Sequence, residues 1–249
     1  WIVSRWADEN GFERKRNFMI QISNLSKKYG ETVVFSDLNY TFENACIYGL
    51  VGRNGAGKTT LLNILSNYDK NYTGVISIDR KKMNKVDYLD MPVAYAMDQP
   101  SFFNELTIYE NLLLIASSRK IKKQEAFDKI ERILDGLGLK KYENYSPLEL
   151  SKGTMQRLNN ACAMIQEEKI TIFDEPFSGL DPVQMKLLEN VIVEFHKKEK
   201  GIYIISSHDI ECLQNVCDKC LLLHNGQIRE INMEEVDREE IAKILSEGE

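Results

Sequence analysis

The sequence contains no hydrophobic run long enough to span a lipid bilayer. Its longest apolar stretches, residues 112–116 and 220–223, fall far short of the ~18 apolar residues that a spanning helix needs. The N-terminal stretch is charged and lacks the apolar segment of a secretory signal. We therefore expect a soluble, cytoplasmic protein that could act at a membrane only through a partner.

Disulfide frameworks and metal-binding spacings are also lacking. The five cysteines follow no framework pattern, which suits a reducing compartment. Cys217 and Cys220 have the C-x-x-C spacing, but one pair without further cysteines or a nearby histidine makes a poor metal site, so we predict a structural role. The net charge of −6 argues against nucleic acid as the main partner, although a local basic patch is an open alternative.

The composition that remains is that of a globular protein. Hydrophobic residues make up 43% and charged residues 28% of 249 positions, which allows one α/β domain with an inserted subdomain or two small domains. Residues 1–18 differ from the rest because tryptophans and basic residues are scattered there without a period. We interpret this N-terminal extension as a remnant preceding a natural start at Met19; a partner-binding arm is the alternative.

A glycine loop, residues 52–60, is the feature around which the rest of the chain is arranged. It has the pattern G-x-x-x-x-G-K-T between an apolar run at 47–51 and a helical run at 61–65. In such a loop backbone N–H groups and a helix N-terminus face a phosphate chain. Lys58 would reach the β- and γ-phosphates, and the Thr59 hydroxyl would ligate Mg²⁺. A chance glycine-rich turn is the alternative.

Apolar periodicity predicts parallel strands around this loop and a helical insertion between them. Short continuous apolar runs of the doubly buried type occur at residues 170–173 and 202–205. Helical spacing predominates between Thr107 and Tyr142, and a new helix is expected to start near Ser151. Further elements are expected as strands at 18–22, 33–35, 38–42, 74–78, 93–97, 219–223 and 227–231, and as helices at 182–198, 209–216 and 233–245.

Polar residues that could perform chemistry follow several predicted strands. Asp174 and Glu175 come directly after the run at 170–173; Asp174 would hold the Mg²⁺ shell and Glu175 would polarise an attacking water. His208 follows another buried strand and could bond a γ-phosphate. Gln99 ends a strand before the helical insertion and could touch Mg²⁺ or water, although structural roles are the alternative. His196 is expected to be a solvated partner of a helix dipole.

A second phosphate-binding position is expected at the start of the helix after the insertion. Ser151 is a good N-cap residue, and Gly153 follows within the first turn. A helix N-terminus with a hydroxyl group favours an anion, so this end of the helix is either a simple cap or a phosphate site.

From Met19 onward, over more than nine-tenths of the sequence, the chain resembles the nucleotide-binding domain of ATP-binding cassette (ABC) proteins. Tyr29 matches the aromatic residue that stacks on adenine, residues 52–59 the Walker A motif, Gln99 the Q-loop and residues 170–174 the Walker B motif. Glu175 matches the catalytic glutamate, residues 178–181 the D-loop and His208 the switch histidine. The family's L-S-G-G-Q signature reads L-S-K-G-T at residues 150–154, similar to single-domain ATPases of bacterial ABC-2-type exporters.

The resemblance implies a P-loop NTPase fold of the α/β class, with a RecA-like parallel sheet, an antiparallel β subdomain and a helical subdomain inserted at about residues 100–150. It implies catalytic roles for Glu175, His208, Lys58 and Gln99, and Mg²⁺ binding by Thr59, Gln99 and Asp174. ATP binding would fall to Tyr29, Asn54, Gly55, Ala56, Gly57, Lys58, Thr59 and Thr60 and, from a second copy, to Ser151 and Gly153.

The implied function is ATP hydrolysis in a bacterial transporter, with export as the expected direction. Two nucleotide-binding domains, identical or not, would close head to tail and drive separate transmembrane permease subunits from the inner face of the cell membrane. Phe102 and Phe103 would line the groove that receives the permease, unless they are core aromatics. The alternative function is a soluble ABC ATPase that acts on ribosomes or nucleic acid.

Overall fold

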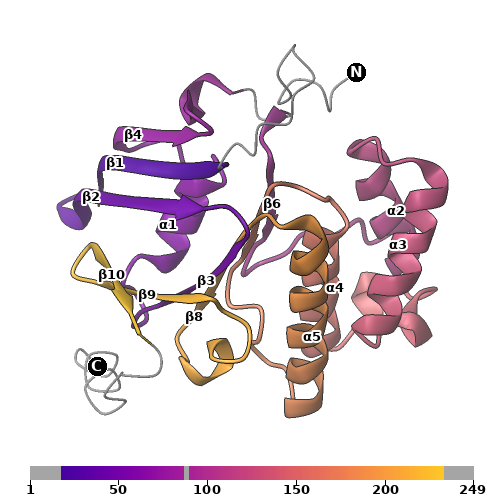
Figure 1. Cartoon of the computed structure of the whole chain (residues 1–249). Helices are drawn as coiled ribbons and strands as arrows, with labels where there is room; N and C mark the ends of the chain where they lie inside the picture. Colours follow the sequence, from indigo (N-terminus) through magenta and orange to yellow (C-terminus); the bar gives the residue numbers. More distant parts are fainter. Residues whose placement is uncertain (1–17, 87–89, 233–249) are drawn as a thin grey trace.

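The computed structural model describes residues 18–86 and 90–232 and has two β-sheets (Figure 1). The larger, six-stranded sheet has the order β10-β9-β3-β8-β7-β6, in which only β10 and β9 pair antiparallel. Its strands are β3 (Cys46–Val51), β6 (Val93–Ala96), β7 (Ile170–Phe173), β8 (Ile202–Ser207), β9 (Lys219–His224) and β10 (Gln227–Ile231). The smaller, antiparallel sheet has the order β2-β1-β4-β5 and comprises β1 (Met19–Tyr29), β2 (Thr32–Glu43), β4 (Thr73–Ile78) and β5 (Lys81–Lys82).

The central strands of the larger sheet are buried on both faces, as their continuous apolar sequences predict. On β8, Tyr203 and Ile205 join one hydrophobic cluster, whereas Ile202 and Ile204 join the other. This alternation follows the two-residue repeat of a strand. The first cluster packs against the helices α2–α5, and the second packs against α1 and the antiparallel sheet.

The helices of the insertion lie together at one side of the molecule, away from the antiparallel sheet (Figure 1). A capping box at Thr107 and Glu110 starts α2, because each side chain accepts a hydrogen bond from the other residue's backbone N–H. The helices are α1 (Lys58–Leu65), α2 (Ile108–Ser118), α3 (Lys123–Gly136), α4 (Lys152–Met164) and α5 (Pro182–Glu199). Within the described residues, none of these helices is long and apolar enough to cross a membrane.

Several expectations need correction. The runs at 33–35 and 38–42 belong to one strand, β2, and the helix expected at 209–216 is only a short 3-10 turn at Glu211–Leu213. His196 is buried rather than solvated: its ring Nε2 lies 3.2 Å from the Gly201 carbonyl oxygen, and burial lowers its pKa. The helix expected at 233–245 and nearly all of the N-terminal extension lie outside the described residues.

The C-x-x-C pair behaves as a structural feature. Cys220 is buried in β9, and burial raises the pKa of its thiol to about 12, so the thiol stays protonated at neutral pH. Across the described part of the chain, no group of three or more His, Cys, Asp or Glu side chains is placed to hold a metal ion.

Candidate active site

The parallel strands bring the predicted site residues to one edge of the larger sheet. Val51 pairs with Ser207, and Phe173 pairs with Ile205, so β3, β7 and β8 end at nearly the same level. The chain segments that leave these ends are the glycine loop, the Asp174–Glu175 pair and His208. Residues that are far apart in the sequence therefore meet because parallel strands share their carboxyl edge.

The glycine loop closes tightly over the start of α1. Gly57 has a φ of 100°, and a Cβ atom there would lie 2.7 Å from the Val34 Cγ1 atom, so both conformation and space require glycine. Lys58 begins the helix, and its ammonium donates to the Gly52 carbonyl oxygen at 2.7 Å. With the side chain only 7% exposed, the cation is held inside the loop where phosphates would approach.

Asp174 lies beneath the loop and is fully buried. Its Oδ1 atom accepts a hydrogen bond from the Ser206 hydroxyl at 2.6 Å, and its Oδ2 atom accepts one from the Tyr95 hydroxyl at 3.4 Å. The Thr59 hydroxyl also bonds this carboxyl group. Burial is the main influence on its pKa, which is raised above the usual value for aspartate.

The donor set around Asp174 fits a magnesium ion. A buried carboxylate is costly unless a cation or several hydrogen bonds compensate it, and here hydroxyl groups supply the bonds. Mg²⁺ prefers oxygen ligands, and it commonly takes one or two protein groups together with phosphates and water. Thr59 and Asp174 are the two residues that could hold it in this arrangement.

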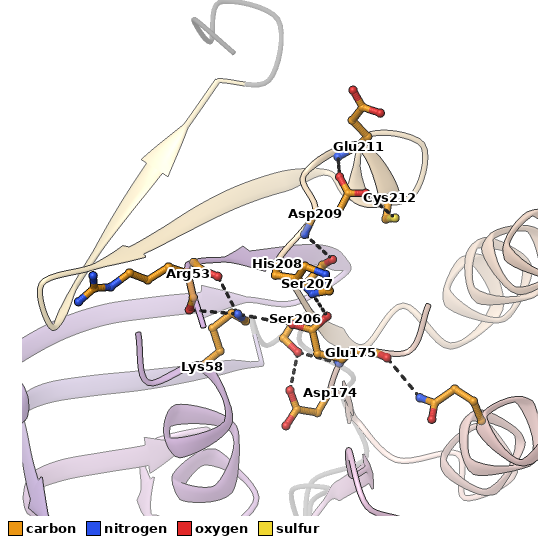
Figure 2. Close-up of polar contacts among 12 residues, drawn as sticks. Arg53, Lys58, Asp174, Glu175, Ser206, Ser207, His208, Asp209, Glu211 and Cys212 are labelled. Atoms are coloured by element: carbon orange, nitrogen blue, oxygen red, sulfur yellow. Dashed lines mark hydrogen bonds and ion pairs between the residues drawn. The ribbon is translucent and has the colours of Figure 1, made fainter. Parts of the chain in front are cut away.

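Glu175 connects the glycine loop to β8. Its Oε1 atom lies 3.5 Å from the Lys58 ammonium, and its Oε2 atom lies 2.9 Å from the His208 Nδ1 atom (Figure 2). Its φ of 48° is left-handed, which costs about 1–2 kcal/mol for a residue with a side chain. The Glu175 backbone N–H donates to the Ser206 hydroxyl at 2.9 Å, and this bond holds the strained residue in place.

The Lys27 ammonium covers one face of the Tyr29 ring. The Lys27 ammonium lies 4.5 Å from the ring centroid and pairs with the Asp69 carboxylate at 2.7 Å. The Tyr29 hydroxyl donates to the same carboxylate at 3.1 Å. These contacts fix the ring, and its half-exposed remainder is available for stacking on a planar base.

A cavity of about 510 Å³ joins these parts. Its lining includes most of the predicted nucleotide-binding residues, the predicted catalytic residues Glu175 and His208, and several residues that were not predicted. The full set is Tyr29, Thr32, Val34, Arg53, Asn54, Gly55, Gly57, Lys58, Thr59, Thr60, Asp98, Glu175, Ser178 and His208. Ala56, Gln99 and the fully buried Asp174 are not among the described residues that line it. Gln99 is exposed next to Asp98, which does reach the cavity.

Ser151 and Gly153 lie outside this cavity in the same chain. Ser151 caps α4 by accepting a hydrogen bond from the Thr154 backbone N–H, and it lines a different hollow with Thr154 and Arg157. A Cβ atom at Gly153 would lie 2.9 Å from the Gly179 carbonyl oxygen, so only glycine fits there. Of the predicted site residues that the structure describes, these two are thus separate from the glycine loop.

Sequence reasoning missed the polar residues that support the acidic pair. Ser206 contacts both Asp174 and Glu175, and Gln156 on α4 donates to the Glu175 carbonyl oxygen at 3.3 Å. Tyr95 bonds Asp174 from the neighbouring strand β6. A usable signal existed for Ser206, because it interrupts an apolar run two residues before His208. The sequence around Gln156 and Tyr95 offers no comparable signal.

A family model described as "ABC transporter" matches residues 35–178, which is more than half of the chain. The match includes the glycine loop, Lys58, Asp174 and Glu175. The chain belongs to the ABC transporter family. The α/β P-loop fold and the nucleotide-binding domain predicted from the sequence are thereby confirmed.

The relatives of this ABC protein are ATP-binding subunits of several transport systems. It is 32% identical to an uncharacterized ABC transporter ATP-binding protein of Methanocaldococcus jannaschii, over 84% of its own length and 75% of the relative's. It is 30% identical to the bacitracin transport ATP-binding protein BcrA of Enterococcus faecalis, over 89% and 71% of the two lengths. The tungstate uptake system ATP-binding protein TupC of Peptoclostridium acidaminophilum is also 30% identical, over 85% and 97%.

A solved structure of the ATP-binding subunit of an ABC transporter has a similar fold. Its TM-score is 0.78 at 26% identity, and the match covers 91% of this chain and 94% of the other. The ABC protein described here is therefore an ATPase of the transporter type, and ATP is its nucleotide.

Proposed function

We propose that this ATPase energises export through separate transmembrane permease subunits, by closing head to tail with a second nucleotide-binding domain. The observation that carries the proposal is the separation of Ser151 and Gly153 from the cavity that holds Lys58 and Glu175. Because a helix N-terminus with a hydroxyl group favours a phosphate, the start of α4 is suited to complete the site of a partner domain.

In the proposed cycle, ATP enters the cavity, and its phosphates take the place of the Glu175 carboxylate beside the Lys58 ammonium. Glu175 then orients and polarises the attacking water, while His208 holds the Glu175 carboxylate through its Nδ1 atom. Magnesium held by Thr59 and Asp174, with Gln99 reaching in from its exposed position, would neutralise charge on the phosphates. Closure of two domains sequesters the reaction from water, and hydrolysis releases them.

An exposed apolar surface on the insertion supports a membrane-protein partner. Phe103 is 59% exposed and Leu148 is 74% exposed, whereas Phe102 packs against the core. The segments that carry them lie side by side, because the Ser146 hydroxyl donates to the Asn104 carbonyl oxygen at 2.8 Å. Such clustered exposure is typical of an interaction site.

The direction of transport rests on Lys152 within the L-S-K-G-T sequence, which resembles that of exporters. The relatives include a bacitracin transport protein and a tungstate uptake protein, so family membership alone is compatible with either direction. The relatives also favour transport over a role on ribosomes or nucleic acid.

The test is affinity purification of the full chain from its native host membranes. We expect a polytopic membrane protein to be retained by the wild-type chain. The double variant Phe103→Asp, Leu148→Asp should reduce its recovery at least about fivefold, because each substitution places a charge in an apolar contact. Tyr68 is an aromatic residue of similar exposure that follows α1 and lies outside the insertion. Tyr68→Asp therefore serves as the matched control and is expected to retain the partner. Recovery of ribosomal proteins instead of a membrane protein would contradict the transporter role.

A further inference from the structure

Thr154 occupies one of the two positions at which this chain departs from the L-S-G-G-Q signature; Lys152 is the other. Its side chain is only 3% exposed although it lies in the first turn of α4. Its Oγ1 atom lies 2.9 Å from the Ser151 Oγ atom and 3.2 Å from the Arg157 Nη2 atom. The hydroxyl group is therefore held between the signature serine and a buried arginine.

The contact with Arg157 favours one direction for the hydrogen bond between the Thr154 and Ser151 hydroxyl groups. A guanidinium can only donate, so Arg157 donates to the Thr154 Oγ1 atom. The Thr154 hydroxyl proton then has one acceptor among the contacts of the described residues, the Ser151 Oγ atom. Ser151 Oγ already accepts the Thr154 backbone N–H at 3.2 Å, so both of its lone pairs are used. In this arrangement Ser151 Oγ is the acceptor, and its own proton is available for donation outward.

The arginine itself is anchored to the helical insertion. Its Nη1 atom donates to the Leu137 carbonyl oxygen at 2.7 Å and to the Gly138 carbonyl oxygen at 3.3 Å. These carbonyls lie just beyond the C-terminal end of α3, where the helix dipole favours a cation. Arg157 is only 5% exposed, and moving its side chain away would break these bonds in a buried environment.

We propose that Thr154 is a positioning residue that keeps the Ser151 hydroxyl oriented as a hydrogen-bond donor toward the terminal phosphate of a nucleotide held by a second copy of the chain. This inference rests on the proposed head-to-tail dimer. Phosphate oxygens only accept hydrogen bonds, so a serine whose lone pairs are both occupied is matched to them, whereas a serine that donates to Thr154 would present a lone pair to an anion.

The experiment uses the full chain carrying Glu175→Gln, which is expected to accumulate the ATP-bound dimer. The dissociation constant of that dimer is measured by analytical ultracentrifugation with saturating ATP and Mg²⁺, and ATP affinity is measured on the dilute monomer. We expect Thr154→Val, which keeps the shape and removes the hydroxyl, to weaken the dimer about tenfold, as for the loss of one hydrogen bond to a charged group. Monomer affinity for ATP should be unchanged.

Two further variants distinguish the proposed positioning role of the Thr154 hydroxyl from a general loss of fold. Thr154→Ser restores the hydroxyl and is expected to restore the dimer to within about twofold of the parent. Ser151→Ala weakens the dimer, and adding Thr154→Val to it has no further effect, because both act through one proton.

If Thr154→Val had the parent's dimer dissociation constant while Ser151→Ala weakened the dimer, the positioning role of Thr154 would be overturned. The head-to-tail proposal would stay intact. Failure of Thr154→Ser to rescue would overturn the positioning role as well, because the hydroxyl would not be the responsible group. A parent-like dimer for Ser151→Ala would overturn both proposals.

Discussion

Replacing Glu175 by glutamine lowers the rate of ATP hydrolysis at least about 100-fold and leaves ATP bound, because the amide cannot take up a proton from the attacking water. The side chain keeps its size, so its contacts with Lys58 and His208 lose charge but little packing. Phosphate release from the purified full chain gives the rate, and size-exclusion chromatography with light scattering shows whether an ATP-bound dimer accumulates.

Glu194→Gln is a suitable control for that experiment. Glu194 is an exposed residue of α5 that pairs only with Lys198 among the described ion pairs, at 3.1 Å. Its replacement should leave hydrolysis unchanged, since a surface ion pair contributes little. If Glu175→Gln hydrolysed ATP at the wild-type rate, the assignment of the general base would be wrong.

Replacing Lys58 by methionine should remove both ATP binding and hydrolysis. The ammonium is buried in the glycine loop and is positioned by the Gly52 carbonyl oxygen, so methionine would leave the phosphates without this cation. Charge-assisted hydrogen bonds to phosphate are among the strongest polar contacts, and we expect ATP affinity to fall by more than about tenfold. Isothermal titration calorimetry with ATP and Mg²⁺ measures this directly.

Lys70→Met controls for the loss of a positive charge. Lys70 is an exposed residue shortly after α1. Because surface charges are screened by salt, its replacement should leave the affinity for ATP within about twofold of the wild-type value. Wild-type ATP binding by Lys58→Met would contradict the role of Lys58 in the loop.

The sheet edge that carries the candidate site was predictable from the sequence because its geometry is local. Asp174 and Glu175 follow a doubly buried strand directly, and parallel strands must end at a common edge, so their meeting with Lys58 and His208 needs no knowledge of loop paths. The same applies to the glycine loop, where Gly57 is required by a positive φ and by close packing.

Contacts between distant segments were not predictable. Lys27 of β1 pairs with Asp69, which follows α1 in the sequence. The register of β1 at Lys27 depends on β-bulges, and the composition of the strand gives no sign of them. The helix expected at residues 209–216 was wrong as well, because the structure has only a short 3-10 turn at Glu211–Leu213 there. His196 was expected in water because charged neighbours surround it in sequence, yet its ring packs on Tyr203.

The central claim is that each chain supplies half of a catalytic site. Mixing two inactive variants tests it most directly. Lys58→Met retains Ser151 but has no functional glycine loop, and Ser151→Ala retains the loop but has no serine to offer. A mixed dimer contains one complete site, so the mixture is predicted to hydrolyse ATP well above the sum of the two separate rates. A mixed rate equal to that sum would contradict the claim.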